Sequence, residues 1–183
     1  LFPDISLRFQ RESLDLLHIK NEKRLSSKKF RHFCADEIIT TSHPYNILNN
    51  PNLDSLNIPI WISKYLRYIF LEKAITSSKI KNFPKKIYIN RKDATALRYI
   101  INIDEVENIL SNFGYENLTM SDYSFSDQIA LFYNASEIIG LHGAGFANII
   151  FCKQGSKIIE LRPNTAGDII KNLAQTNNHI YFD

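Results

Sequence analysis

The sequence predicts an α/β protein with a Rossmann-like parallel sheet and helices on both faces, preceded by a partial N-terminal segment. Three observations lead to this fold class. Short apolar runs of strand length recur along the C-terminal part of the chain, helical patterns with start signals separate them, and a glycine-rich turn follows one of the runs. Strands that alternate with helices form βαβ units, which pair in parallel through right-handed crossovers.

The composition is that of a globular protein with a mild positive charge. The chain has 183 residues, of which 44% are hydrophobic, and its net charge is +3. This length suits one domain or one and a half. We interpret the basic clusters as solvated surface, with a phosphate or membrane contact as the alternative. They are Lys28, Lys29 and Arg31, and Lys79, Lys81, Lys85 and Lys86. They are not interleaved with aromatic residues in one run, so we expect no nucleic-acid partner.

Cysteine spacing and hydropathy indicate the cellular compartment in which the protein is expected. Cys34 and Cys152 lie far apart and provide neither metal-ligand spacing nor a disulfide framework, so we expect a reducing environment. No apolar run approaches the ~20 residues that a membrane span needs. We therefore expect a cytoplasmic protein, and leave open a peripheral contact with the inner face of the membrane. Because the chain begins with Leu1, we also leave open whether it is a fragment of a longer enzyme.

Residues 1–82 are predicted to be a partial N-terminal segment with a linker. Its strongest element is a helix over residues 60–74, in which Trp61, Tyr65 and Tyr68 recur at helical spacing. We expect these aromatic side chains to pack in the core or against another domain. Weaker patterns predict a helix at 13–19, a strand at 37–41, turns at 43–45 and 49–51, and a linker at 77–85.

Residues 83–183 are predicted to form the Rossmann-like domain. Its strand candidates are the runs at 86–90, 115–120, 137–141, 157–161 and 179–182. A small polar residue followed three positions later by an acid predicts a capped helix start. This pattern occurs at Asn102 with Glu105, at Ser124 with Asp127 and at Thr165 with Asp168. We expect the first of these helices to end at Gly114.

The stretch 138–148 carries the strongest functional signal. Its strand passes into Gly143 and Gly145, and glycine lets the backbone adopt φ > 0 or approach a ligand closely. We expect a helix over residues 146–152 after this turn, and the free N–H groups at a helix start bind phosphate. His142 lies on the lip of the turn, at the carboxyl end of the strand, where ligands bind in open α/β sheets. A loop histidine between small residues has little packing to do, which favours a functional role.

Polar side chains follow two more of the predicted strands. Arg91 comes after the first strand and Glu160 lies near the end of the fourth, so both are expected at the same sheet edge as His142. Arginine suits a bidentate grip on phosphate, and a carboxylate can accept hydrogen bonds from ribose hydroxyls. The alternatives are a surface ion pair for Arg91 and a pair with Arg162 or a lysine for Glu160. Arg98 either joins this site or pairs with a neighbouring aspartate.

Several of these residues fall in a pattern that resembles glycosyltransferase family 61. The resemblance rests on three blocks over residues 86–161: Ile-Tyr-Ile-Asn-Arg ending at Arg91, with Arg98, Asn102 and Glu105; residues 125–132 and Ala135, with Gly-Leu-His-Gly-Ala-Gly at 140–145, Asn148 and Phe151; and Ile-Ile-Glu-Leu at 158–161. Asn90, Ile103 and Phe146 stand where the family usually has Ser, an acid and Leu. Family members normally carry more chain on the N-terminal side, which should hold much of the acceptor site.

The resemblance implies the C-terminal half of a GT-B-type glycosyltransferase. Such an enzyme moves a sugar from a nucleotide-activated donor to a glycan acceptor with inversion. Bacterial members often act in capsular or surface polysaccharide synthesis, so we expect a hexosyl- or pentosyltransferase of this kind. His142 and Arg91 would be catalytic. The donor nucleotide would be bound by Gly143, Ala144, Gly145, Asn148, Glu160 and Arg98.

The sequence contains no Asp-x-Asp pair, which would hold a divalent ion on the diphosphate. We therefore expect no metal, and no cofactor besides the donor itself. The general base is not identified, and Asp36, Glu37 and His43 are the candidates.

The sequence leaves two other functions open. A dinucleotide-dependent oxidoreductase or epimerase would want a third glycine, where Asn148 stands, and an acid about 20 residues further on, where Glu160 lies. A non-catalytic module that binds nucleotide or glycan is the other alternative. The donor sugar, the acceptor and the oligomeric state are also open.

Overall fold

The computed structural model describes residues 5–39, 50, 53, 56, 58–94 and 99–183. It contains a five-stranded parallel sheet in the order β2-β1-β3-β4-β5, which confirms the predicted fold class. The strands are β1 (Lys86–Ile89), β2 (Glu116–Leu118), β3 (Glu137–Leu141), β4 (Lys157–Leu161) and β5 (Ile180–Phe182).

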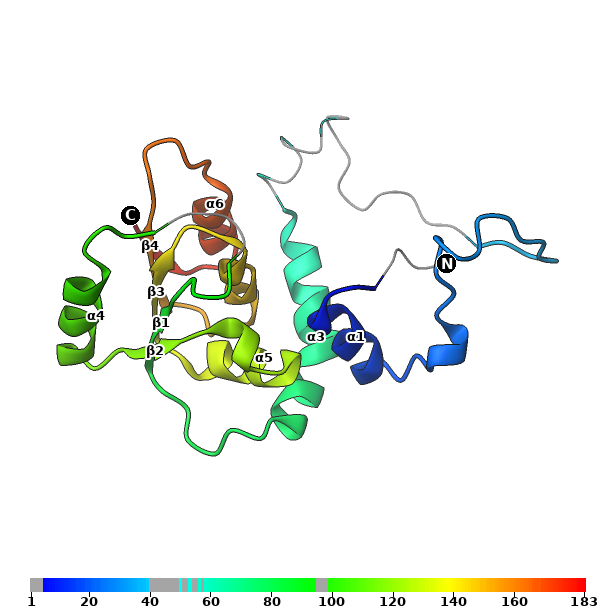
Figure 1. Cartoon of the computed structure of the whole chain (residues 1–183), viewed down its shortest axis with the longest axis horizontal. Helices are drawn as coiled ribbons and strands as arrows, with labels where there is room; N and C mark the ends of the chain where they lie inside the picture. The colour runs from blue at the N-terminus through cyan, green and yellow to red at the C-terminus, as the bar shows by residue number, and fades with distance from the viewer. Residues whose placement is uncertain (1–4, 40–49, 51–52, 54–55, 57, 95–98) are drawn as a thin grey trace.

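Helices cover both faces of this sheet (Figure 1). They are α1 (Arg8–Leu16), α3 (Ile60–Ser77), α4 (Ile103–Asn112), α5 (Phe125–Asn134) and α6 (Ile169–Thr176), with the 3₁₀ helices η1 (Asn21–Lys23), η2 (Met120–Asp122) and η3 (Ala144–Phe151). Helix α4 lies on one face, while α5, η3 and α6 lie on the other, and α3 and α1 pack outside α5. This is the arrangement that right-handed crossovers produce, because the chain leaves β1 in one direction along the sheet and β2 in the other.

The central strands are buried on both sides, which explains their nearly continuous apolar sequences. Successive side chains of a strand point to opposite faces. Ile87 and Ile138 therefore face the larger core beneath α5, and Tyr88 and Ile139 face the smaller core beneath α4. The same alternation places Glu160, which pairs in register with Gly140, on the side of the larger core.

Two of the predicted helix boundaries are confirmed in detail. Ser124 caps α5, because its hydroxyl accepts a hydrogen bond from the N–H of Asp127 at 3.1 Å. Gly114 terminates α4 two residues after its last helical residue, with φ +79°, and the N–H of Tyr115 donates to the carbonyl of Leu110 at 2.9 Å. These contacts form a Schellman motif, which satisfies carbonyls that a helix end leaves without partners.

The other two predicted caps are not formed as expected. Asn102 does occupy the N-cap position of α4, but its side chain donates to the carboxylate of Glu105 at 2.9 Å and caps no backbone group. Asp168, in place of Thr165, precedes α6, and its carboxylate pairs with Arg162 at 2.9 Å. In both cases a side-chain partner competes for the polar group that the pattern assigned to the backbone.

Helix α3 is confirmed, but its three predicted aromatic residues do not pack in the core, and only the alternative of a contact with another domain stays a prediction for them. Trp61, Tyr65 and Tyr68 are 50%, 55% and 86% exposed, whereas α3 buries Phe70 and Ala74. Apolar residues occur on every face of this helix, so helical spacing alone does not identify the face that meets α5.

The remaining N-terminal predictions are met in part. The helix expected at 13–19 is α1, which begins earlier and ends at Leu16. Residues 37–39 form no strand, and the rest of that predicted strand, the turn at 43–45 and most of the turn at 49–51 lie outside the described residues. The predicted linker does connect α3 to β1. The division of the chain at residue 82 stays a prediction, and Phe70 of α3 shares one core with Ile87 of β1.

Candidate functional site

The strand order creates one crevice at the carboxyl edge of the sheet. Strand β1 leads to its neighbour on one side through α4, and β3 leads to its neighbour on the other side through η3. Helices therefore leave the two strands on opposite faces, and ligands bind at such a switch point in open α/β sheets. Arg91 follows β1 and His142 follows β3. We call the space between these strand ends the β1/β3 crevice.

Arg91 and His142 meet in this crevice, as predicted. The Arg91 guanidinium donates a hydrogen bond from Nη1 to the backbone carbonyl of His142 at 2.9 Å. Its Nε is buried and has no hydrogen-bond partner among the described residues. A buried donor of this kind is rare in folded proteins and suggests a ligand that accepts its hydrogen bond.

Gly143 provides the space for this guanidinium. A Cβ atom at Gly143 would lie 1.7 Å from Nη1 of Arg91 and 3.0 Å from its Cζ. The φ angle of Gly143 is 163°, which is extended backbone. The positive-φ glycines of the described chain are Gly114 and Gly155, so of the two alternatives for this turn, φ > 0 or a close approach, the first does not hold. What position 143 requires is the absence of a side chain.

The chain after the turn forms η3, a 3₁₀ helix that begins at Ala144, two residues before the predicted start. The first N–H groups of a helix lack partners within it and carry partial positive charge. Ala144, Gly145 and Arg91 line one cavity of about 410 Å³. The crevice therefore combines a guanidinium with the start of a helix, which is an arrangement suited to an anion.

The His142 ring contacts the carboxylate of Glu160, which in turn contacts Tyr181. Its Nδ1 contacts Oε1 of Glu160, and the hydroxyl of Tyr181 donates to Oε2 of Glu160 at 2.5 Å. The side chains of His142 and Glu160 are 12% and 0% exposed. The expectation of a histidine with little packing is therefore wrong, because the ring is packed against a buried carboxylate.

Glu160 does not fit the predicted role of a ribose ligand. Its carboxylate has no exposed surface and points into the larger core, so a nucleotide bound outside the sheet edge cannot reach it. The alternative pair with Arg162 is not formed, since that guanidinium pairs with Asp168 and Asp183 at 2.9 and 3.7 Å. Alternation along β4 decides this orientation.

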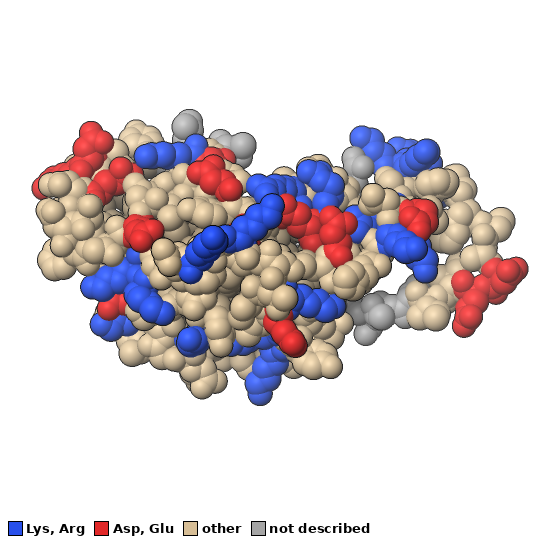
Figure 2. Space-filling model, turned by 90° about the horizontal axis from the view of Figure 1, so that it is seen from below, with Lys and Arg blue, Asp and Glu red and all other residues tan. Residues whose placement is uncertain are grey.

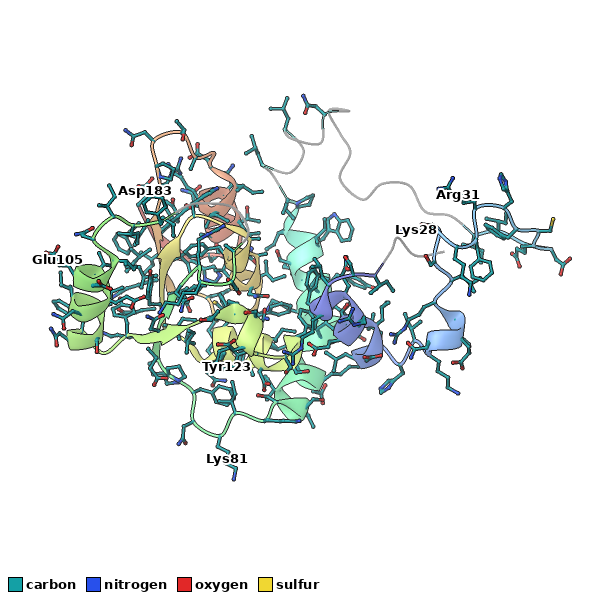
Figure 3. All side chains as sticks on the ribbon, viewed as in Figure 1. Lys28, Arg31, Lys81, Glu105, Tyr123 and Asp183 are labelled. Atoms are coloured by element: carbon teal, nitrogen blue, oxygen red, sulfur yellow. The ribbon has the colours of Figure 1, made fainter. Side chains whose placement is uncertain are left out.

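Asn148 does not line the cavity that contains Arg91. Its side chain donates to the amide oxygen of Gln128 at 3.1 Å and lines an adjoining cavity of about 540 Å³, between η3 and α3, which shares Ala144 and Gly145 with the first. Arg98 and His43 fall outside the described residues. Asp36 and Glu37 are exposed in the segment that carries Lys28 and Arg31, on the far side of α3 from the sheet (Figures 1 and 3).

A second cavity adjoins the crevice on the side of α4, and the sequence patterns did not identify it. It measures about 250 Å³, and its walls include Tyr88, Ile103 and Glu107. It meets the first cavity at Asn90, Arg91 and Leu141. Burial, and then the Glu107 carboxylate, raise the pKa of the Tyr88 hydroxyl.

Asn90 shapes the junction of these two cavities. Its side chain is buried, donates to Asn117 of β2 at 2.6 Å, and accepts from the N–H of Lys92 at 3.1 Å. The sequence signal that could have identified it is an asparagine at the end of a predicted strand, one residue before Arg91.

The lysine clusters lie away from the crevice. Lys81 lies at the amino edge of the sheet, opposite Asp183 at the carboxyl edge (Figure 3). Seen from this amino edge, basic side chains lie among acidic ones (Figure 2). Lys86 and Lys157, for example, pair with Glu137 at 3.7 and 3.2 Å.

Among the described residues, His, Cys, Asp and Glu form no group of three or more that could hold a metal ion. None of the described helices has the length and apolarity to cross a membrane.

Comparisons with known proteins agree with the resemblance seen in the sequence. The family model described as Glycosyltransferase 61 matches residues 7–159. A curated relative from Mus musculus, an EGF domain-specific O-linked N-acetylglucosamine transferase, is 25% identical over 156 residues. The match covers 80% of this chain but 28% of that relative, so the chain spans less than a third of the mouse protein's length.

Proposed function

The chain belongs to glycosyltransferase family 61, and we propose that it binds a nucleotide-sugar donor in the β1/β3 crevice and transfers the sugar to a glycan acceptor. The observation that carries this proposal is the Arg91 guanidinium, which lies across Gly143 beside the start of η3. A nucleoside diphosphate carries several negative charges, and this arrangement neutralises them without an Asp-x-Asp motif.

The two cavities suggest how the donor lies. The diphosphate contacts Arg91 and the first N–H groups of η3, where the cavities meet. The nucleoside occupies the smaller cavity, between Tyr88 and Ile103, and the sugar extends into the larger one. Buried apolar walls with few polar groups are typical of such ligand sites.

The reaction we propose is a direct displacement with inversion. An acceptor hydroxyl oxygen bonds to the anomeric carbon while the bond from that carbon to the phosphate oxygen breaks, and the acceptor proton passes to a base. Negative charge develops on the departing diphosphate. Arg91, the N–H groups at the start of η3 and the imidazole of His142 stabilise it, which is typically the largest contribution to catalysis of this kind.

The wider context of the reaction also belongs to the proposal. The name of the mouse relative favours an N-acetylhexosamine donor, among hexosyl and pentosyl donors in general. The family resemblance favours capsular or surface polysaccharide synthesis on the cytoplasmic side. The alternative of a dinucleotide-dependent oxidoreductase loses its main support, because the acid at the expected position, Glu160, is buried and paired.

Calorimetric titration of UDP, GDP and CDP with excess EDTA tests the proposed site. We expect one of them to bind, and Arg91→Lys to weaken it about tenfold, since an ammonium cannot reproduce the guanidinium fork. Arg11→Lys is the matched control, because Arg11 lies on α1 and contacts the carbonyl of Ser6. Binding that needs a divalent metal, or that survives Arg91→Lys, would overturn the site. Release of sugar from the matching donor, in the presence of glycans, then separates an enzyme from a binding module.

A further inference from the structure

We infer that Tyr181 is a positioning residue, which acts through the buried carboxylate of Glu160 to set the orientation and the tautomer of His142. The inference rests on the proposed function in one respect, namely that His142 acts on the donor. The three side chains come from adjacent strands and form a continuous series that we call the Tyr181–Glu160–His142 row.

The register of the sheet builds this row. Strand β4 lies between β3 and β5, and Tyr181 pairs with Ile158, two residues before Glu160 and on the same face. His142 continues the ladder beyond β3, because its N–H donates to the carbonyl of Leu161 at 2.8 Å. Parallel pairing therefore brings both partners to the same carboxylate, one from each neighbouring strand.

Burial makes both contacts of Glu160 necessary. A carboxylate with no exposed surface must be hydrogen-bonded, because an unpaired buried charge is very costly. Oε1 contacts Nδ1 of His142, and Oε2 accepts the Tyr181 hydroxyl at 2.5 Å. Each oxygen thus has its own partner, and Tyr181 fixes the rotation of the carboxylate that faces the imidazole.

The protons of the row follow from these contacts. Burial, and then the hydrogen bond to Glu160, raise the pKa of Tyr181 to about 12, although Arg162 opposes this and Asp183 adds to it. Tyr181 therefore keeps its proton at neutral pH and can only donate to Glu160. The carboxylate accepts from both sides, which favours a proton on Nδ1 of His142.

Tyr181→Phe removes one hydroxyl and tests the inference. The tautomer of His142 is read from ¹H–¹⁵N correlation spectra of the free protein, with His142→Gln to identify its signals. We expect the Nδ1–H tautomer in the original chain and a mixture in Tyr181→Phe. The kcat for sugar release should fall about tenfold, the lower range for a partner behind a functional histidine, with the KM for the donor nearly unchanged.

Tyr115→Phe is the matched control. The Tyr115 hydroxyl donates to Glu137 at 2.8 Å, at the amino end of β3, and its pKa is also raised to about 12, mainly by burial. This variant loses the same type of bond in the same sheet, and it should alter neither the tautomer nor kcat. Glu160→Gln is the second test, because its amide can donate to Nδ1 and should shift His142 toward the Nε2–H tautomer.

The outcomes distinguish the role of Tyr181 from the role of His142 in the reaction. An unchanged tautomer in Tyr181→Phe, or an equal change in Tyr115→Phe, would overturn the positioning role of Tyr181. An unchanged tautomer in Glu160→Gln would overturn the role of the carboxylate as well. A changed tautomer with unchanged kcat would support that role and remove His142 from the proposed reaction. Loss of nucleotide binding in Arg91→Lys, with an unchanged His142 tautomer, would support both the proposed donor site and the Tyr181–Glu160–His142 row.

Discussion

At the scale of single residues, the β1/β3 crevice depends on a missing side chain. The Arg91 guanidinium lies where the Cβ atom of any other residue at position 143 would be, with Nη1 only 1.7 Å away. Extended backbone with φ 163° is open to every residue, so the constraint at Gly143 is one of space. The glycine and the arginine therefore form one feature, although they lie far apart in the sequence.

This contact predicts that Gly143→Ala weakens binding of the nucleoside diphosphate about tenfold, because the methyl group displaces the guanidinium from the carbonyl of His142. Calorimetry measures the affinity, and urea unfolding measures the stability. Gly114→Ala is the control: φ at Gly114 is +79° and the space around it is open, so alanine should cost about 1 kcal/mol of stability and leave binding unchanged. Full affinity in Gly143→Ala would show that the position of Arg91 does not matter.

At the scale of elements, the carboxylate of Asp127 fastens the chain before β1 to helix α5. Its Oδ1 accepts the Ser78 hydroxyl at 2.7 Å and the N–H of Lys79 at 2.9 Å, and its Oδ2 accepts the Ser124 hydroxyl at 2.6 Å. Burial by itself would raise the pKa of Asp127, but these hydrogen bonds outweigh it and lower the pKa below 3.8. Residues 78–79 are thus tied to the α5 start that Ser124 caps.

Asp127→Asn should lower the free energy of unfolding by about 1–3 kcal/mol at neutral pH, because the amide cannot accept all of these hydrogen bonds. A lowered folded pKa gives stability that is present above the ordinary value of 3.8 and is lost as the pH falls through the folded value. Urea unfolding should therefore show the difference between the two proteins at pH 7 and a smaller one near pH 3. Asp122→Asn, at an exposed aspartate of η2, should change little. A difference that is independent of pH would contradict this account.

At the scale of the whole molecule, α3 belongs to the same core as the sheet. Phe70 packs edge-on against Phe125 of α5, with ring centroids 5.3 Å apart, and Phe125 packs against Phe151 of η3 at 6.5 Å. Arg67 of α3 donates to the carbonyls of Ile150 and Cys152 at 2.8 and 2.7 Å. Apolar and polar contacts together attach α3 to the layer that lies over β3 and β4.

We therefore expect Phe70→Ala to lower the free energy of unfolding by about 3–5 kcal/mol, as for other large residues truncated in a core. Tyr68→Ala is the control from the same helix. It removes a side chain that is 86% exposed, and its effect should stay within about 0.5 kcal/mol. Tryptophan fluorescence reports on α3 through Trp61, and circular dichroism reports on the whole chain. Both should follow one transition, and an earlier transition in fluorescence would show that α3 unfolds separately.

The sequence by itself determined the parallel α/β class, the five strands within a few residues, and the meeting of Arg91 with His142. These features follow from local signals, because apolar runs, the Ser124 cap and Gly114 act within a few residues along the chain. The carboxyl ends of parallel strands share one edge, so the order of strands and polar residues was enough to bring Arg91 and His142 together.

Only the tertiary structure decided what the side chains do at that edge. Glu160 turns inward to hold His142, Asn148 pairs with Gln128 and lines an adjoining cavity, and Gly143 leaves room for Arg91. Trp61, Tyr65 and Tyr68 face outward, because the contact with α5 selects another face of α3. Each outcome depends on which residue arrives from a distant part of the chain, and periodicity along one segment carries no information about that partner. The physical reason is that burial and pairing are set by neighbours in space, whereas sequence patterns report neighbours along the chain.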